Sequence, residues 1–214
     1  AADTKVLAFV MAGGEGTRLY PLTADQAKAA VPFAHGRRIV DFVLSNLVLS
    51  QIMPIYVLAQ YKPHSLIEHV HDVWSAWSRR EDPLISVIVA GVNGANGTFK
   101  GTADCVYQNL DVLRRHRPDF VAVFAADHVY RMDVRQMLSF HMDRDADVTV
   151  AAVPVPLEGV SSFGILRTGA AGELLEFREK PECAVPMPTD STRAYASMGN
   201  YLFRAGVLID LIED

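Results

Sequence analysis

The chain has 214 residues, of which 50% are hydrophobic and 21% are charged, and its formal net charge at pH 7 is −5. These values are typical of a globular protein with a buried core, and they argue against the basic surface that nucleic-acid partners require. The two cysteines, Cys105 and Cys183, lie far apart without a CxxC motif. This argues against a disulfide scaffold or a zinc site and favours a cytoplasmic protein.

The apolar runs are too short for a membrane protein. None approaches the roughly 20 residues that a membrane-spanning helix needs, so we expect no membrane partner. The first run begins at Val6 and is broken by glycines at once, unlike the apolar region of a signal peptide. At the other end, Val207–Asp214 has the pattern of a helix without a cap, and we expect the chain to be a fragment of a longer protein.

Short apolar runs alternate with helical patterns as far as Val155. We predict strands at Val6–Met11, Ile55–Leu58, Leu84–Val89, Phe120–Ala125 and Asp147–Val155. Apolar residues recur at helical spacing in Ile39–Ser50, Ser65–Trp77, Thr102–Arg115 and Val134–Asp143. This alternation predicts an α/β fold whose sheet is covered on both faces. From Gly164 onward, short strands separated by proline and glycine are expected at Gly164–Arg167, Leu174–Lys180 and Tyr195–Phe203.

A glycine-rich segment, Ala12–Leu19, follows the first strand directly. Its three glycines let the backbone turn tightly and bring N–H groups close to an anion, and Arg18 adds a cation suited to phosphate oxygens. The segment is not a Walker loop, because the chain has no Gly-Lys pair followed by Ser or Thr. It is not a dinucleotide loop, because Leu19 stands in place of the third glycine. The remaining interpretations are a different phosphate loop and a plain glycine turn.

Eight segments, in order, carry a resemblance to a known family: Ala12–Leu19, Ala27–Phe33, Val40–Asn46, Gly101–Asp104, Ala126–Tyr130, Phe163–Gly164, Phe177–Pro181 and Ser197–Tyr201. With them the chain resembles the pyrophosphorylase domain of bacterial ADP-glucose pyrophosphorylases, which are glucose-1-phosphate adenylyltransferases. The resemblance implies a three-layer, Rossmann-like nucleotidyltransferase fold with a mixed, mainly parallel sheet. It also implies that residues 1–214 form one catalytic domain, without its C-terminal part and without the family's β-helix domain, through which the full-length protein would form homo-oligomers.

The same resemblance implies the reaction and its residues. ATP and glucose-1-phosphate would give ADP-glucose and pyrophosphate, with Mg²⁺ as cofactor. The expected catalytic residues are Arg18, Lys28 and Asp127, of which Asp127 would also bind the metal. The expected nucleotide-binding residues are Ala12, Gly13, Gly14, Gly16, Thr17, Gly101, Thr102 and Asp104.

A second group of residues is expected to bind the sugar phosphate. Lys180 would hold its phosphate, Glu179 and Ser197 would bond sugar hydroxyls, and Gly164 would allow the sugar to approach closely. Phe99 stands where the family often has tyrosine, so it would keep a stacking face but lack a hydroxyl. Two further residues match positions at which relatives bind effectors, namely Arg38 and Arg115.

The chain departs from the family in the segment Ile88–Gly97. It lacks the proline and glutamine that the family commonly carries near the nucleotide base. Two alternatives therefore stay open: an enzyme that uses UTP or dTTP, and a non-catalytic regulatory paralogue that binds nucleotide or sugar phosphate. Elsewhere, we expect Trp74 and Trp77 to belong to the core or to a subunit interface. His64, His69 and His71 do not share a metal-ligand spacing with a carboxylate on one helix face, and we expect them to be ordinary surface or packing residues.

Overall fold

The computed structural model describes residues 4–75, 84–91 and 97–214. The chain forms two compact units. The first comprises Ala1–Thr149 and Tyr201–Asp214, and the second comprises Val150–Asn200. Within the described residues, no helix is long and apolar enough to cross a membrane.

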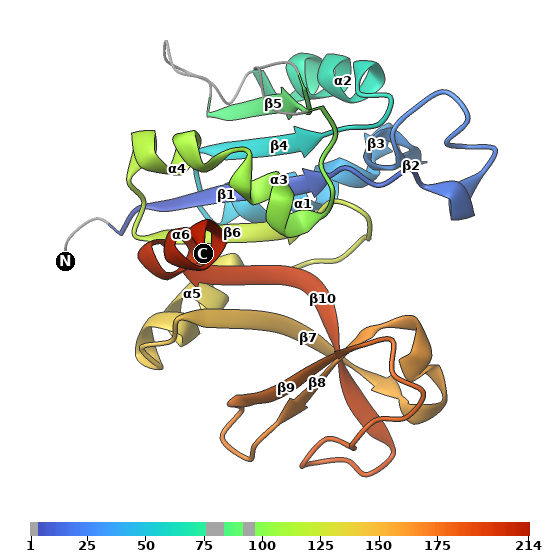
Figure 1. The fold of residues 1–214 in the computed structure, drawn as a ribbon. Helices are drawn as coiled ribbons and strands as arrows, with labels where there is room; N and C mark the ends of the chain where they lie inside the picture. Colours follow the sequence, from blue (N-terminus) through green and yellow to red (C-terminus); the bar gives the residue numbers. More distant parts are fainter. Residues whose placement is uncertain (1–3, 76–83, 92–96) are drawn as a thin grey trace. The chain divides into compact units, whose positions relative to one another are not determined.

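A parallel sheet lies at the centre of the first unit (Figure 1). Its strands follow the order β5-β4-β1-β6. Consecutive residues of β1 are fully buried, from Leu7 to Val10, because side chains on both faces of this central strand are covered. The strands are β1 (Val6–Ala12), β4 (Ile55–Ala59), β5 (Ile85–Val89) and β6 (Phe120–Ala125).

Helices cover both faces of this sheet. Figure 1 shows α3, α4 and α6 in front of the strands and α1 behind them. Leu7, Phe9 and Val121 of the sheet share one buried cluster with Leu113 of α4 and Leu208 of α6. The helices of this unit are α1 (Ile39–Leu49), α2 (His64–Trp74), α3 (Thr102–Tyr107), α4 (Leu110–His116), α5 (Val134–Asp143) and α6 (Ala205–Glu213).

The single helix predicted over Thr102–Arg115 is wrong, since the structure has two helices there. The break lies at Asn109, which is buried and whose side-chain Nδ2 donates to the carbonyl oxygen of Cys105 over 2.8 Å. That carbonyl would accept the backbone N–H of Asn109 in a continuous helix. The backbone N–H instead bonds the carbonyl of Val106, because a short amide side chain competes with the helical pattern.

The second unit contains antiparallel strands. The β8 and β9 strands form a hairpin, and β10 pairs antiparallel with β8. A small cluster of buried residues, which includes Val160 and Ile165, forms its core. The strand β10 continues into the first unit at Tyr201. The strands are β7 (Val148–Pro156), β8 (Gly164–Thr168), β9 (Leu174–Glu179) and β10 (Arg193–Arg204), with a 3-10 helix, η4 (Leu157–Ser162), before β8.

The packing predictions for Trp74 and His69 agree with the structure. Trp74 is buried, and its indole N–H donates to Asp41 Oδ1 over 2.8 Å. His69 is also buried, with Nε2 2.7 Å from the same oxygen, so it is a packing residue as expected. Trp77 lies outside the described residues. The elements that the sequence did not predict are short: η1 (Thr17–Leu19), η2 (Lys28–Ala30), β2 (Pro32–Ala34), β3 (Arg37–Arg38) and η4 (Leu157–Ser162).

Candidate active site

A cavity of about 460 Å³ opens in the first unit at the carboxyl ends of three neighbouring parallel strands. Ala12 ends β1, Leu58 lies near the end of β4, and Ala125 ends β6. Open α/β sheets bind their ligands at this edge. The predicted site residues that line the cavity are Ala12, Gly13, Gly14, Gly16, Thr17, Arg18, Lys28, Phe99, Gly101, Thr102 and Asp127.

The glycine loop forms one wall of this cavity, and Gly16 is its most constrained residue. The φ angle of Gly16 is 70°, in the left-handed region that favours glycine. Its carbonyl accepts the backbone N–H of Leu19 over 2.9 Å and so closes the short helix η1, which carries Arg18. A Cβ atom at Gly16 would come within 2.9 Å of Lys28 Cβ. The glycine therefore allows the loop to turn close to the lysine.

Arg18 projects from η1 as an exposed cation on the cavity wall. Within the described parts of the chain, its guanidinium makes no hydrogen bond or ion pair. A guanidinium without a protein partner is available to bind two phosphate oxygens at once.

Lys28 reaches the cavity from the short helix η2. The next two residues, Ala29 and Ala30, are buried and anchor this helix, while the Lys28 side chain remains 21% exposed. Its Nζ donates to Asp127 Oδ2 over 3.1 Å. Lys28 is therefore not a lysine directed to the outer surface. It places a cation beside a carboxylate at the end of β6.

The carboxyl group of Asp127 is kept ionised by its neighbours. A hydrogen bond from the His128 side chain, together with the charge and hydrogen bond of Lys28, holds the pKa of Asp127 well below its usual range, although partial burial opposes this. His128 Nδ1 lies 3.0 Å from Asp127 Oδ1, and the His128 ring stacks on Tyr130 with centroids 4.6 Å apart. Asp127 thus presents a negative charge to the cavity across the whole physiological pH range.

This carboxylate is suited to a hard divalent cation. Mg²⁺ is commonly held by one or two carboxylates together with phosphate oxygens of the substrate. The described residues contain no group of three or more His, Cys, Asp or Glu side chains that could hold a metal ion by themselves. An ion beside Asp127 could take further oxygen ligands from the phosphates of a nucleotide.

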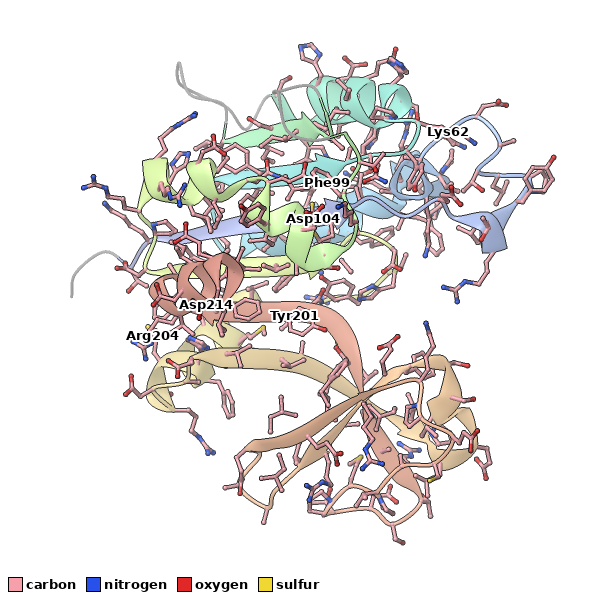
Figure 2. The ribbon with its side chains drawn as sticks, viewed as in Figure 1. Lys62, Phe99, Asp104, Tyr201, Arg204 and Asp214 are labelled. Atoms are coloured by element: carbon pink, nitrogen blue, oxygen red, sulfur yellow. The ribbon has the colours of Figure 1, made fainter. Side chains whose placement is uncertain are left out.

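The segment that leads into α3 forms another part of the cavity wall, and Figure 2 labels Phe99 and Asp104 of this region. Phe99, Gly101 and Thr102 line the cavity, whereas Asp104 does not. The Asp104 carboxylate accepts the backbone N–H of Lys100 and the side chain of Gln108, each over 2.8 Å, and so fixes the start of the helix. Of the segment Ile88–Gly97, in which the chain departs from the family, residues 92–96 lie outside the described residues.

Gln60 and Cys105 are among the residues that line the cavity without having been predicted as site residues. Gln60 follows β4, and its Oε1 accepts the backbone N–H of Phe99 over 2.6 Å. Its position just after an apolar strand is the same signal that pointed to Asp127, and it could have been found in the same way. Cys105 also lines the cavity, but burial, followed by the charge of Asp104, raises the pKa of its thiol to about 12, so it is not a nucleophile.

The predicted sugar-phosphate residues other than Phe99 lie in the second unit. Lys180 Nζ lies 3.2 Å from Glu179 Oε1, and both side chains are more than half exposed. The Ser197 hydroxyl accepts the backbone N–H of Gly199 over 3.1 Å. A Cβ atom at Gly164 would meet the Phe177 ring at 2.6 Å, so the missing side chain there leaves room for this ring.

The two candidate effector residues have local partners. Arg38 donates from its guanidinium to the carbonyl of Ser65 over 2.7 Å and so connects the start of α1 to α2. Arg115 is exposed on α4 and lies 3.6 Å from Asp111, four residues earlier. Neither residue lines the cavity.

Comparison with known proteins identifies the family. Residues 7–214 match the family model described as nucleotidyl transferase. A glucose-1-phosphate adenylyltransferase of Thermodesulfovibrio yellowstonii is 50% identical over 208 residues, which cover 97% of this chain and 51% of the relative. Those of Anaeromyxobacter sp. and Thermus caldophilus are 49% and 46% identical, each over 98% of this chain and 51% of the relative. The chain spans about half the length of these relatives, and it belongs to the nucleotidyl transferase family.

Proposed function

We propose that the chain is the catalytic part of a glucose-1-phosphate adenylyltransferase, which makes ADP-glucose for glycogen synthesis. The observation that carries the proposal is that the glycine loop, Arg18, Lys28 and Asp127 line one cavity. These groups provide backbone donors, two cations and one carboxylate, which is the set that transfer of a nucleotidyl group needs. The names of the relatives supply the substrate pair, ATP and glucose-1-phosphate.

The proposed reaction is a displacement at the α-phosphorus of ATP. A phosphate oxygen of glucose-1-phosphate forms a bond to that phosphorus, and the bond to the oxygen that bridges to the β-phosphorus breaks. The electron pair leaves with pyrophosphate. Such a step depends on in-line positioning and on neutralising the charge of the transition state. Backbone N–H groups of the glycine loop and the Arg18 guanidinium would hold the triphosphate, and Lys28 would neutralise charge near the reacting phosphorus.

The proposed cofactor is Mg²⁺ held by Asp127 and by phosphate oxygens. The ion would supply further charge neutralisation at the triphosphate. The low pKa of Asp127 supports this assignment, because the carboxylate needs no deprotonation before it binds a cation.

The proposed sugar-phosphate residues keep the roles that the family resemblance implies. Lys180 would bind the phosphate, Glu179 and Ser197 would bond sugar hydroxyls, and Phe99 would offer a stacking face. The exposed side chains of Glu179 and Lys180 support these roles, because they are accessible to a ligand.

A panel of substrates tests the function. Pyrophosphate release is measured with ATP, UTP, dTTP, GTP and CTP, each with glucose-1-phosphate and with other sugar-1-phosphates. We expect ATP with glucose-1-phosphate to give the highest kcat/KM. A preference for UTP or dTTP would replace the adenine assignment, and binding of nucleotide without any turnover would favour the regulatory paralogue.

A pair of arginine variants makes the test specific to the cavity. Arg18→Met removes a cation from the cavity wall, whereas Arg37→Met removes an exposed cation on β3 that does not line the cavity. We expect a loss of at least about 100-fold in kcat/KM for Arg18→Met, in keeping with removal of a charged contact to the transition state. We expect little change for Arg37→Met. An equal effect of both variants would contradict a catalytic role for Arg18.

We further propose that the protein acts in the cytoplasm and that its full-length form is a homo-oligomer. Both cysteines are free thiols, which supports a reducing compartment. Size-exclusion chromatography with light scattering on the full-length protein would test the oligomeric state, and a monomer would contradict the proposal.

A further inference from the structure

Arg18 has no side-chain partner in the described residues, so among the contacts described there only the backbone turn that carries it restrains its position. That turn, η1, is closed by the hydrogen bond from the Leu19 N–H to the Gly16 carbonyl. The same carbonyl accepts a second hydrogen bond over 2.9 Å, from the hydroxyl of Thr23. Thr23 follows η1 in the chain and is only 4% exposed. A buried hydroxyl therefore holds the residue at which the turn begins.

Thr23 contacts Gly16 with its methyl group as well. A Cβ atom built on Gly16 would lie 2.8 Å from Thr23 Cγ2. The methyl group therefore lies against the bare Cα of the glycine. The hydroxyl and the methyl group of Thr23 both contact Gly16, and substitution can remove them one at a time. Valine lacks the hydroxyl, and serine lacks the methyl group.

The backbone of Thr23 is hydrogen-bonded by a lysine from a different loop. Lys62, labelled in Figure 2, lies in the loop between β4 and α2. Its Nζ donates to the carbonyls of Thr23 and Ala24 over 2.8 and 2.6 Å. The φ angle of Lys62 is 45°, in the left-handed region that favours glycine.

We propose that Thr23, braced by Lys62, is a positioning residue for Arg18. The hydroxyl of Thr23 fixes the Gly16 carbonyl, this carbonyl closes the turn, and the turn aims the guanidinium into the cavity. Lys62 keeps the Thr23 backbone in place. The consequence for catalysis rests on the proposed function of Arg18, whereas the hold on the turn does not depend on any substrate.

The hold on the turn is tested first, in the free protein, by hydrogen exchange of the Leu19 amide. We expect Thr23→Val, which keeps the shape but removes the hydroxyl, to speed this exchange several-fold to about tenfold, the factor that corresponds to one net hydrogen bond. Thr23→Ser keeps the hydroxyl and should stay near the wild-type rate. Lys62→Met should speed the exchange less, because Lys62 is exposed.

Two matched controls separate this effect from general loosening. Thr149→Val removes another hydrogen-bonded hydroxyl, which lies 2.8 Å from His141 Nδ1 and does not line the cavity. Lys5→Met removes an exposed lysine outside the cavity. Neither control should change exchange at Leu19. The proposal would be overturned if the Leu19 amide of Thr23→Val exchanged at the wild-type rate. It would also be overturned if Thr149→Val sped this exchange as much as Thr23→Val does.

The consequence for catalysis is tested by steady-state kinetics. We expect Thr23→Val to lower kcat by about tenfold and to change KM for the triphosphate by less than threefold, while Thr23→Ser restores kcat. The double variant Thr23→Val/Lys62→Met should be little worse than Thr23→Val alone, because the two residues act in one chain of contacts. Unchanged kcat in folded Thr23→Val would overturn the catalytic part.

Failure of the proposed function gives a different result. In that case the wild-type chain itself releases no pyrophosphate with any triphosphate. The exchange of the Leu19 amide still decides whether Thr23 holds the turn.

Discussion

Gly16 offers a quantitative test of the glycine loop, because an added methyl group would incur two separate costs. The first is conformational, since a φ angle of 70° costs alanine about 1–2 kcal/mol. The second is steric, since the new Cβ would lie 2.8 Å from Thr23 Cγ2 and 2.9 Å from Lys28 Cβ. Overpacking of this kind costs about 1–3 kcal/mol. We therefore expect Gly16→Ala to lower the free energy of unfolding by about 2–5 kcal/mol.

Two other glycines separate these costs. Gly36 has a φ angle of 75° and nothing within 4 Å of an added Cβ, so Gly36→Ala should lose only the conformational part, about 1–2 kcal/mol. Gly14 lies outside the left-handed region and also has nothing within 4 Å. Gly14→Ala should therefore remain within about 1 kcal/mol of the wild type.

The assay is urea unfolding of the four proteins, followed by circular dichroism and analysed with a common m value. The expected order of stability is wild type and Gly14→Ala, then Gly36→Ala, then Gly16→Ala. If Gly16→Ala were as stable as Gly36→Ala, the contacts with Thr23 and Lys28 would not be tight. If Gly16→Ala were as stable as Gly14→Ala, the left-handed conformation of Gly16 would be refuted.

Three further variants test other parts of the structure. Asp127→Asn should lower kcat by at least about 100-fold with little change in melting temperature, and a near-normal rate would remove this carboxylate from the reaction. Burial lowers the pKa of His141 in the folded protein below the ordinary value of 6.5, so the unfolded chain binds a proton at this residue more readily than the folded protein does. The free energy of unfolding is therefore highest above pH 6.5 and decreases as the pH falls below 6.5. Urea midpoints at pH 7.5 and 5.5 should therefore differ less in His141→Asn than in the wild type; an equal difference would exclude His141 as the cause. Asp41→Ala leaves His69 and Trp74 without their buried partner and should cost about 3 kcal/mol in urea unfolding, whereas a loss below about 1 kcal/mol would show that the cluster contributes little.

The sequence predicts the parallel sheet well because its strands are buried on both faces. The strand Phe120–Ala125 and the helix Val134–Asp143 have the predicted bounds. The break at Asn109 could not be predicted from apolar spacing, because the pattern of apolar residues continues across it and only a side-chain hydrogen bond interrupts the helix.

In the candidate site, too, some residues could be predicted from the sequence and others could not. Residues that follow an apolar strand, such as Asp127, could be predicted, because parallel strands bring their carboxyl ends to one edge of the sheet. The supporting contacts could not, because they join segments distant in the sequence. Lys62 bonds two carbonyls in the loop after η1, and neither partner carries a motif. The pairing of Lys28 with Asp127 is likewise visible only in three dimensions.

The two thiols of this chain differ in a way that is useful for spectroscopy. Cys105 is buried in the first unit and its pKa is raised to about 12, so almost none of it is thiolate at neutral pH. Cys183 is exposed in the second unit. A maleimide dye at pH 7 should therefore attach at Cys183 alone, which gives a single fluorescent reporter on the second unit without any engineered cysteine.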